Sequence, residues 1–211
     1  MESIDCPLCS GTSSHYHTQR QREFLQCSLC LSVFTHPDNY LTSDEEKAHY
    51  ECHNNDPADI RYQNFLSPAI NAVLRDYNQS EKGLDFGSGT GSPIVKVLSD
   101  NGYNINQYDI FFHNDPEKLN FSYDYITCTE VAEHFKEPLI EFKALRNMLK
   151  PNGKLYVMTD MFDENRDFAT WYYKTDLTHV FLYHPKAFEW IKDNIGFKNV
   201  TFDKRLIVLE S

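Results

Sequence analysis

The sequence predicts an α/β protein whose mostly parallel sheet carries helices on both faces, preceded by a small cysteine-rich segment. Three observations lead to this prediction. Strand-like and helix-like segments alternate from residue 83 onward, the order that builds parallel sheets. A glycine-rich turn, 84-LDFGSGTGS-92, joins the first of these strands to a helix. Two Cys-x2-Cys pairs lie within the first 30 residues.

The main domain, residues 81–211, is expected to begin with strand 83–86, the glycine turn and a helix over 93–101 that starts at Pro93. Further strands are expected at 104–111, 123–130 and 154–160, with a helix over 138–149. A last helix at 185–194 precedes two strands, 198–203 and 205–210, which are joined tightly enough to be antiparallel.

Two other segments precede the main domain. Residues 1–40 carry four of the six cysteines and little periodic apolar pattern, so we expect a zinc-binding ribbon. Residues 41–80 are expected to form a helical linker or lid, with two helices separated by 53-HNNDP-57. Thr42 or Ser43 suits the cap of the first helix, and Pro68 is expected to kink or interrupt the second.

The composition excludes several classes of protein. With 211 residues, 41% of them hydrophobic, the chain suits one ordinary domain with a small appendage. A net charge of −11 without a basic stripe argues against nucleic acid as a partner, because phosphate contacts need clustered Lys and Arg. No apolar run approaches the roughly 20 residues that span a bilayer, and MESIDCPLCS shows no signal peptide. We therefore expect a cytoplasmic protein without a membrane segment, of undetermined oligomeric state.

The cysteine pairs predict a zinc site. Cys6-x2-Cys9 and Cys27-x2-Cys30 are 17 residues apart, within the spacing of four-cysteine zinc sites. Four thiolates complete a tetrahedron around one ion. Disulfides are disfavoured in a cytoplasmic protein, and a redox pair is not expected in duplicate. His15 and His17 lie between the pairs as substitute ligands, although four cysteines suffice.

The glycine turn suits a cationic ligand better than a pyrophosphate. The dinucleotide pattern fails at Ser92, and no Gly-Lys-Ser/Thr follows as in a phosphate-binding loop. Asp85, two residues before Gly87, would repel a pyrophosphate but attract an ammonium or sulfonium group. Asp109, at the end of the next strand, suits the two hydroxyls of a ribose. An amino-acid cation and a ribose together describe S-adenosylmethionine.

The order of these motifs resembles class I S-adenosylmethionine-dependent methyltransferases. The resemblance covers about residues 83–160 and rests on LDFGSGTG, the YD pair at Asp109, 124-DYITCTEVAEH-134 and 149-LKPNGKLYV-157. It implies a Rossmann-like sheet of order 3-2-1-4-5-7-6 with strand 7 antiparallel. Only residues 110–123 stand where this family has its third strand and a helix, so the sheet is expected to be shortened there.

The resemblance also implies roles for individual residues. The methionine part of the cofactor would lie against Asp85 and the loop, the ribose against Asp109, and the adenine against Ile110 or Phe111. Phe111 and Phe112 would replace the adenine wall that the shortened region lacks. The residues after the fourth strand would line the site. In this sequence the loop and lining residues are Gly87, Ser88, Gly89, Gly91, Cys128, Thr129 and Glu130.

The acceptor is expected beside 171-WYYKTDLTHVFLYHP-185, which follows the fifth strand and offers aromatic surface with polar groups. An acceptor that must lose a proton needs a base, and histidine suits this near neutral pH. His179 is the first candidate catalytic residue and His134 the second. The alternatives are that the aromatic side chains and His179 belong to the core, and that His134 caps a helix or supports the cofactor. His49 and His53 suit a lid, without an assigned role.

The favoured function is methyl transfer to a small-molecule acceptor by an enzyme with a zinc-binding head. The head resembles those of some bacterial methyltransferases, including sugar C-methyltransferases. One alternative is a methyltransferase-like protein that docks to a macromolecule through the ribbon, a protein rather than RNA, since Arg20 and Arg22 are the only Lys or Arg residues in 1–40. A second alternative is a non-catalytic cofactor-binding protein. Whether oxygen, nitrogen or carbon is methylated is left open.

Overall fold

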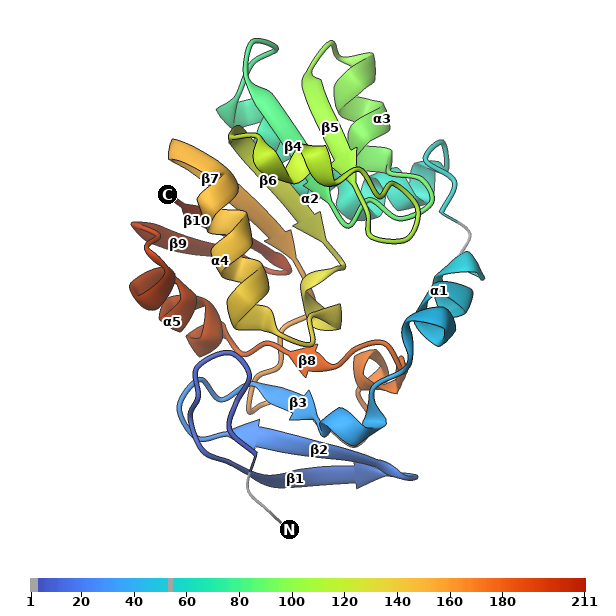
Figure 1. Cartoon of the computed structure of the whole chain (residues 1–211), viewed down its shortest axis with the longest axis vertical. Helices are drawn as coiled ribbons and strands as arrows, with labels where there is room; N and C mark the ends of the chain where they lie inside the picture. Colours follow the sequence, from blue (N-terminus) through green and yellow to red (C-terminus); the bar gives the residue numbers. More distant parts are fainter. Residues whose placement is uncertain (1–3, 53–54) are drawn as a thin grey trace.

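The structure, a computed structural model, describes residues 4–52 and 55–211 (Figure 1). Its larger sheet has six strands in the order β5-β4-β6-β7-β10-β9. The first four are parallel, and β10 is antiparallel to both of its neighbours. The strands are β4 (Lys82–Phe86), β5 (Asn104–Tyr108), β6 (Tyr123–Thr129), β7 (Leu149–Met158), β9 (Asn199–Asp203) and β10 (Leu206–Glu210). The predicted α/β fold and the antiparallel closing pair are confirmed.

The shortening around the third strand is also confirmed. In the described part of the chain no strand lies outside β5, and the segment that would supply one forms the short 3-10 helix η2 (Pro116–Asn120). Strand β5 itself ends at Tyr108, earlier than the expected residue 111. The reason is local: the Asp109 carboxylate accepts hydrogen bonds from the amides of Phe111 and Phe112, which turns the chain away from the sheet.

Two pairs of helices cover the sheet. Helices α2 (Ile60–Asp76) and α3 (Pro93–Asp100) pack on one face, where Tyr125 and Tyr156 meet them. Helices α4 (Pro138–Met148) and α5 (Pro185–Ile195) pack on the other face. Both faces are therefore apolar, as expected for a mostly parallel sheet.

Pro68 does not interrupt α2, contrary to one expectation. The helix continues through it from Ile60 to Asp76. A proline has no amide hydrogen for the carbonyl four residues earlier. Here the Ser67 hydroxyl donates to that carbonyl, of Asn64, at 2.7 Å. The side chain of the preceding residue thus satisfies the backbone group that proline leaves unpaired.

The N-terminal segment shares a sheet with the main domain. Strands β1 (Ser13–Gln19), β2 (Arg22–Cys27) and β3 (Val33–Thr35) form a meander. The edge strand β3 pairs with β8 (Phe181–Leu182), which comes from the far end of the chain (Figure 1). The rings of Phe34 and Phe181 stack at 6.0 Å across this junction. Residues 1–40 therefore complete their sheet and core only with residues near position 181.

Helix α1 (Ser43–Glu51) connects this four-stranded sheet to α2. Thr42 caps it in a capping box with Glu45, as one of the two expected caps. Glu46 forms an ion pair with Lys136 at 2.9 Å, which ties α1 to the segment after β6. The expected break at 53–57 lies partly outside the described residues. None of the described helices combines the length and the apolar character that a membrane span requires.

Candidate functional site

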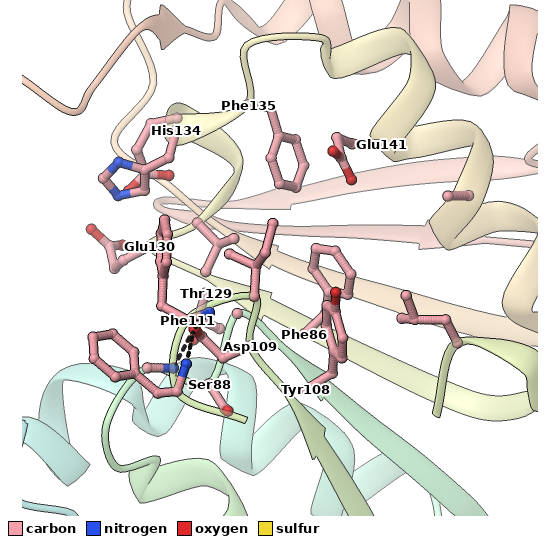
Figure 2. A pocket seen from close by; sticks show the side chains of 18 of the residues that line it. Phe86, Ser88, Tyr108, Asp109, Phe111, Thr129, Glu130, His134, Phe135 and Glu141 are labelled. Carbon is pink, nitrogen blue, oxygen red and sulfur yellow. Dashed lines mark hydrogen bonds and ion pairs between the residues drawn. The ribbon is translucent and has the colours of Figure 1, made fainter. Parts of the chain in front are cut away.

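A cavity of about 960 Å³ opens at the carboxyl ends of β4, β5 and β6 (Figure 2). This is the edge at which open α/β sheets bind their ligands. The glycine turn and the ends of β5 and β6 form one part of its wall. Tyr50 of α1 and two residues of the late loop, Asp176 and His179, form another part. The expected cofactor and acceptor segments therefore meet around one space.

The glycine turn owes its shape to close backbone contacts. Gly87 has a φ of 77°, and a Cβ atom there would lie 2.4 Å from Val131. Gly89 has a φ of 61°, and its amide donates to Asp109 Oδ2 at 2.9 Å. A Cβ atom on Gly91 would lie 2.7 Å from the carbonyl oxygen of Asn55. Side chains would thus disturb both the turn and the segments that approach it.

Asp109 is the carboxylate that joins the two loops. Besides the Gly89 amide, it accepts from the amides of Phe111 at 2.9 Å and Phe112 at 3.1 Å (Figure 2). It lines the cavity together with Ser88, Ile110 and Phe111. The rings of Phe86 and Tyr108 stack nearby at 5.5 Å and supply further aromatic wall. The structure thus brings the expected ribose acid and adenine residues together.

Asp85 lies beneath this wall and does not line the cavity. It is 3% exposed, and the Thr127 hydroxyl donates to its Oδ1 at 2.6 Å. Burial raises the pKa of its carboxyl to about 6. Cys128 is also buried, and partly exposed Gly91 does not line the cavity either, whereas Thr129 and Glu130 do. Asp85, Gly91 and Cys128 are therefore not part of the cavity lining.

Two carboxyl groups follow β6 and share a tyrosine. Glu130, with a φ of 54°, accepts from Arg205 at 2.5 Å, and its Oε2 lies 3.3 Å from the hydroxyl oxygen of Tyr173, whose one hydrogen goes to Glu133. Glu133 is fully buried and accepts from the same hydroxyl at 2.5 Å. Burial raises the pKa of both carboxyl groups to about 7. Glu133 was missed as a site residue, although it lies in the quoted EVAEH, because its burial depends on distant parts of the chain.

The two candidate catalytic histidines face each other across the same space. The ring centroids of His134 and His179 are 4.8 Å apart. His134 Nδ1 bonds to the Thr178 carbonyl at 3.0 Å, and His179 Nδ1 to the Tyr173 carbonyl at 2.7 Å. A carbonyl only accepts, so each Nδ1 carries hydrogen and each neutral ring keeps its lone pair on Nε2. Burial lowers the pKa of both, that of His179 to about 3.

Arg22 of β2 shapes the loop that carries His179. Its guanidinium donates to the carbonyls of Lys174, Asp176, Leu177 and His179. The side chain is 9% exposed, and this planar group with several donors is well suited to bind several acceptors at once. Sequence reasoning found no role for Arg22, because its partners lie about 150 residues later.

The aromatic side chains of 171–185 are mostly core. Trp171, Tyr173, Phe181 and Tyr183 are buried, and Tyr172 is exposed. The expectation that these rings form an acceptor surface is therefore wrong for Trp171, Phe181 and Tyr183, whereas the centroid of the buried Tyr173 ring lies 4.2 Å from that of His179. The core alternative accounts for those three rings, while Asp176 and His179 of the same segment reach the cavity. His49 lies 3.3 Å from Asp176, and His53 lies outside the described residues.

The four cysteines of the N-terminal segment converge. Their sulfur atoms all lie within 4.8 Å of one another, with Cys6–Cys30 at 3.7 Å and Cys9–Cys27 at 3.4 Å. Four sulfurs at 2.3 Å from a tetrahedral zinc lie about 3.8 Å apart. The amides of Leu29 and Cys30 point at Cys27 Sγ, which suits a thiolate. The donor set fits zinc, and His15 and His17 are not part of this cluster.

Comparison with known proteins shows the family to which the main domain belongs. The model of a family described as "Methyltransferase domain" matches residues 59–201. A ubiquinone biosynthesis O-methyltransferase of Histophilus somni is 43% identical over 49 residues, and one of Marinobacter nauticus is 42% identical over 45 residues. These matches cover 23% and 21% of this chain and only 19% and 18% of the relatives.

Solved structures share the fold at low sequence identity. A SAM-dependent methyltransferase from Archaeoglobus fulgidus superposes with a TM-score of 0.57 at 14% identity, over 71% of this chain and 94% of that one. A 1,6-didemethyltoxoflavin-N1-methyltransferase of Burkholderia thailandensis gives 0.55 at 10% identity, over 94% and 99% of the two chains. Human N-acetylserotonin methyltransferase gives 0.53 at 15% identity, over 81% and 56%.

Proposed function

The chain belongs to the family of methyltransferase domains, and from that premise we propose that it transfers a methyl group from S-adenosylmethionine to a small molecule. The observation that carries the proposal is the link between the glycine turn and Asp109 at the carboxyl edge of the sheet. This link places a carboxylate, a close backbone turn and aromatic rings around one cavity. Such a set suits a ribose, an amino-acid group and an adenine.

The cofactor would occupy the part of the cavity beside β4 and β5. Asp109 would accept from one ribose hydroxyl, since a carboxylate has about four lone-pair sites and its amide donors use three. Phe111 and Phe112 would flank the adenine in place of the missing third strand. Asp85 would favour the cofactor's positive charge from beneath the turn. The methyl-bearing sulfonium would then face the ends of Thr129 and Glu130.

The acceptor would occupy the remaining part, between His134, His179 and Tyr50. A cavity of about 960 Å³ is within the range that holds small ligands, which supports a small molecule rather than a macromolecule. Methyl transfer needs the acceptor atom held near about 3 Å from the methyl carbon, in line with the breaking bond. The buried rings and carboxyl groups around the two histidines supply rigid positions for that purpose.

The cysteine cluster would hold one structural zinc ion. In so small a segment the metal contributes folding free energy directly. Three of the four cysteines belong to one core cluster with Phe34 and Phe181, the rings that join β3 and β8, which supports a structural role at this junction rather than docking of a partner. Metal analysis of the purified protein is expected to find zinc that Cys27→Ser removes; folded wild-type protein free of zinc would contradict this assignment.

Substitution of Asp109 tests the proposed cofactor site. Asp109→Ala should weaken S-adenosylhomocysteine binding at least ~10-fold, because hydrogen bonds to a charged group contribute about 1.5–3 kcal/mol. Titration calorimetry measures the affinity. The matched control is Asp115→Ala, an exposed acid that caps η2 and does not line the cavity. Equal affinities of the Asp109 variant and the wild type would refute the site.

A further inference from the structure

The walls of the acceptor part of the cavity contain a second set of metal-ligating side chains. One ligand atom from each of Glu133, His134 and His179 lies within 4.8 Å of those from the other two. All three residues line the cavity. Two histidines and one carboxylate, with an open position, form a common ligand set for catalytic zinc and for other divalent transition metals.

The hydrogen bonds of the two histidines orient them as ligands. Each Nδ1–H donates to a backbone carbonyl, Thr178 for His134 and Tyr173 for His179. Metal-binding histidines almost always donate their other ring hydrogen to a carbonyl, carboxylate or water in this way. The lone pairs on Nε2 are then available, and His134 Nε2 lies 4.0 Å from Glu133 Oε1, the oxygen that also accepts from the Tyr173 hydroxyl.

Glu133 supplies the carboxylate of this ligand set from a buried position. Its side chain is fully buried, and its second oxygen, Oε2, has no hydrogen-bond partner among the described residues. Its first oxygen accepts from the Tyr173 hydroxyl, which fixes the carboxylate in place. A buried carboxylate with an unpartnered oxygen is costly unless a cation or donor meets it. Among the same described residues, Oε1 of the neighbouring Glu130 is also buried without a hydrogen-bond partner.

We propose that Glu133, His134 and His179 bind a divalent transition-metal ion that holds an oxygen atom of the acceptor beside the transferable methyl group. Ligands of such an ion lie about 3.4 Å from one another, so the side chains would close by on the order of 1 Å. The role in catalysis, unlike metal binding itself, rests on the proposed function. It narrows the acceptor to a small molecule with a hydroxyl group.

The ion would act on the acceptor as a Lewis acid. A hydroxyl bound to a metal ion loses its proton, here to solvent, far more readily than a free hydroxyl. The oxygen's electron pair then forms the bond to the methyl carbon. The carbon–sulfur bond breaks with its pair on sulfur, which converts the sulfonium to neutral S-adenosylhomocysteine. In this account the two histidines are ligands and not the general bases first expected of them.

The experiment titrates Mn²⁺ into zinc-loaded protein and measures free Mn²⁺ by electron paramagnetic resonance. The protein is loaded with one zinc ion per chain, which the four thiolates take, so that the second set stays free; Mn²⁺ prefers oxygen donors to thiolates. We expect one Mn²⁺ per chain, with affinity lowered at least 10-fold by Glu133→Gln and His179→Gln. Tyr173→Phe, which removes only the hydroxyl that orients Glu133, should weaken binding about 10-fold.

The matched control is His184→Gln. His184 is as buried as His179, but it caps α5 and lies outside the ligand set. S-adenosylhomocysteine binding by each variant shows that the cofactor half remains folded. Absence of Mn²⁺ binding by the wild type, or equal binding by Glu133→Gln and His179→Gln, would overturn the metal site. Mn²⁺ binding by a wild type that does not bind S-adenosylhomocysteine would overturn only its role in methyl transfer.

Discussion

At the scale of single residues, the site places carboxyl groups where burial works against their charge. Asp85, Glu130 and Glu133 all have a raised pKa because burial disfavours the charged form. In the proposed complex, positive charge would come from the cofactor near Asp85 and from a metal ion near Glu133. Carboxyl groups that destabilise the empty protein would then contribute binding free energy.

Asp85 gives a pH-dependent prediction for stability. Its pKa rises from the ordinary 3.8 to about 6 on folding, so the folded state holds the proton more tightly. This contribution is fully present below pH 4 and is lost as the pH rises from about 4 to 6. Above pH 6 the free energy of unfolding of Asp85→Asn should therefore exceed that of the wild type by up to ~3 kcal/mol. The variant should then unfold at a higher denaturant concentration. The difference should vanish below pH 4.

Asp124 serves as the control of opposite sign. It lies on β6, and although burial opposes the effect, hydrogen bonds from Lys150 and the Lys82 amide lower its pKa. Asp124→Asn should lose stability at neutral pH, and the loss should shrink in acid. Denaturant unfolding at several pH values checks both variants. A lower stability of Asp85→Asn than of wild type at pH 8 would contradict the assigned effect of burial.

At the scale of elements, the four-stranded sheet that contains β1, β2 and β3 holds the loop of residues 174–179 against the cavity. Strand β8 joins β3, and Arg22 of β2 bonds to four carbonyls between Lys174 and His179. The segment that holds the cysteines therefore positions a histidine of the cavity. The N-terminal segment thus has its structural partner within this chain, in residues 174–182.

Arg22→Lys tests this junction. A lysine has one ammonium and cannot replace the guanidinium at four carbonyls, so buried acceptors would be left unsatisfied at about 1–3 kcal/mol each. We expect a clearly lowered midpoint of thermal unfolding and weaker Mn²⁺ binding, with S-adenosylhomocysteine affinity retained. The control is Arg20→Lys in the exposed β1–β2 turn. An Arg22 variant that matches this control in all three measurements would contradict the role.

Elements and sites that depend on neighbouring residues were predictable from sequence. The glycine turn, the Pro93 start of α3 and the Cys-x2-Cys pairs each express their structure within a few residues. Features that depend on distant contacts were not. The pairing of Val33 with Leu182, the carbonyl partners of Arg22 and the burial of Glu133 arise only when far segments meet. The expected interruption of α2 at Pro68 is absent for a local reason: the hydroxyl of the neighbouring Ser67 satisfies the Asn64 carbonyl.

At the scale of the whole molecule, two sheets contribute to one cavity (Figure 1). The six-stranded sheet lines it through the ends of β4, β5 and β6, where we place the cofactor. The four-stranded sheet does not line it but holds, through Arg22, the loop that carries Asp176 and His179. The family assignment covers residues 59–201 and therefore leaves out the cysteine cluster and α1. These added parts are where the specificity of this chain for its acceptor is expected to reside.

The central claim is that the cavity binds S-adenosylmethionine. Its most direct test is titration calorimetry of the zinc-loaded protein with S-adenosylhomocysteine, with NAD as the control ligand. We expect one S-adenosylhomocysteine to bind per chain and NAD to give no heat of binding. Binding of NAD, or no binding of S-adenosylhomocysteine to the folded protein, would contradict it.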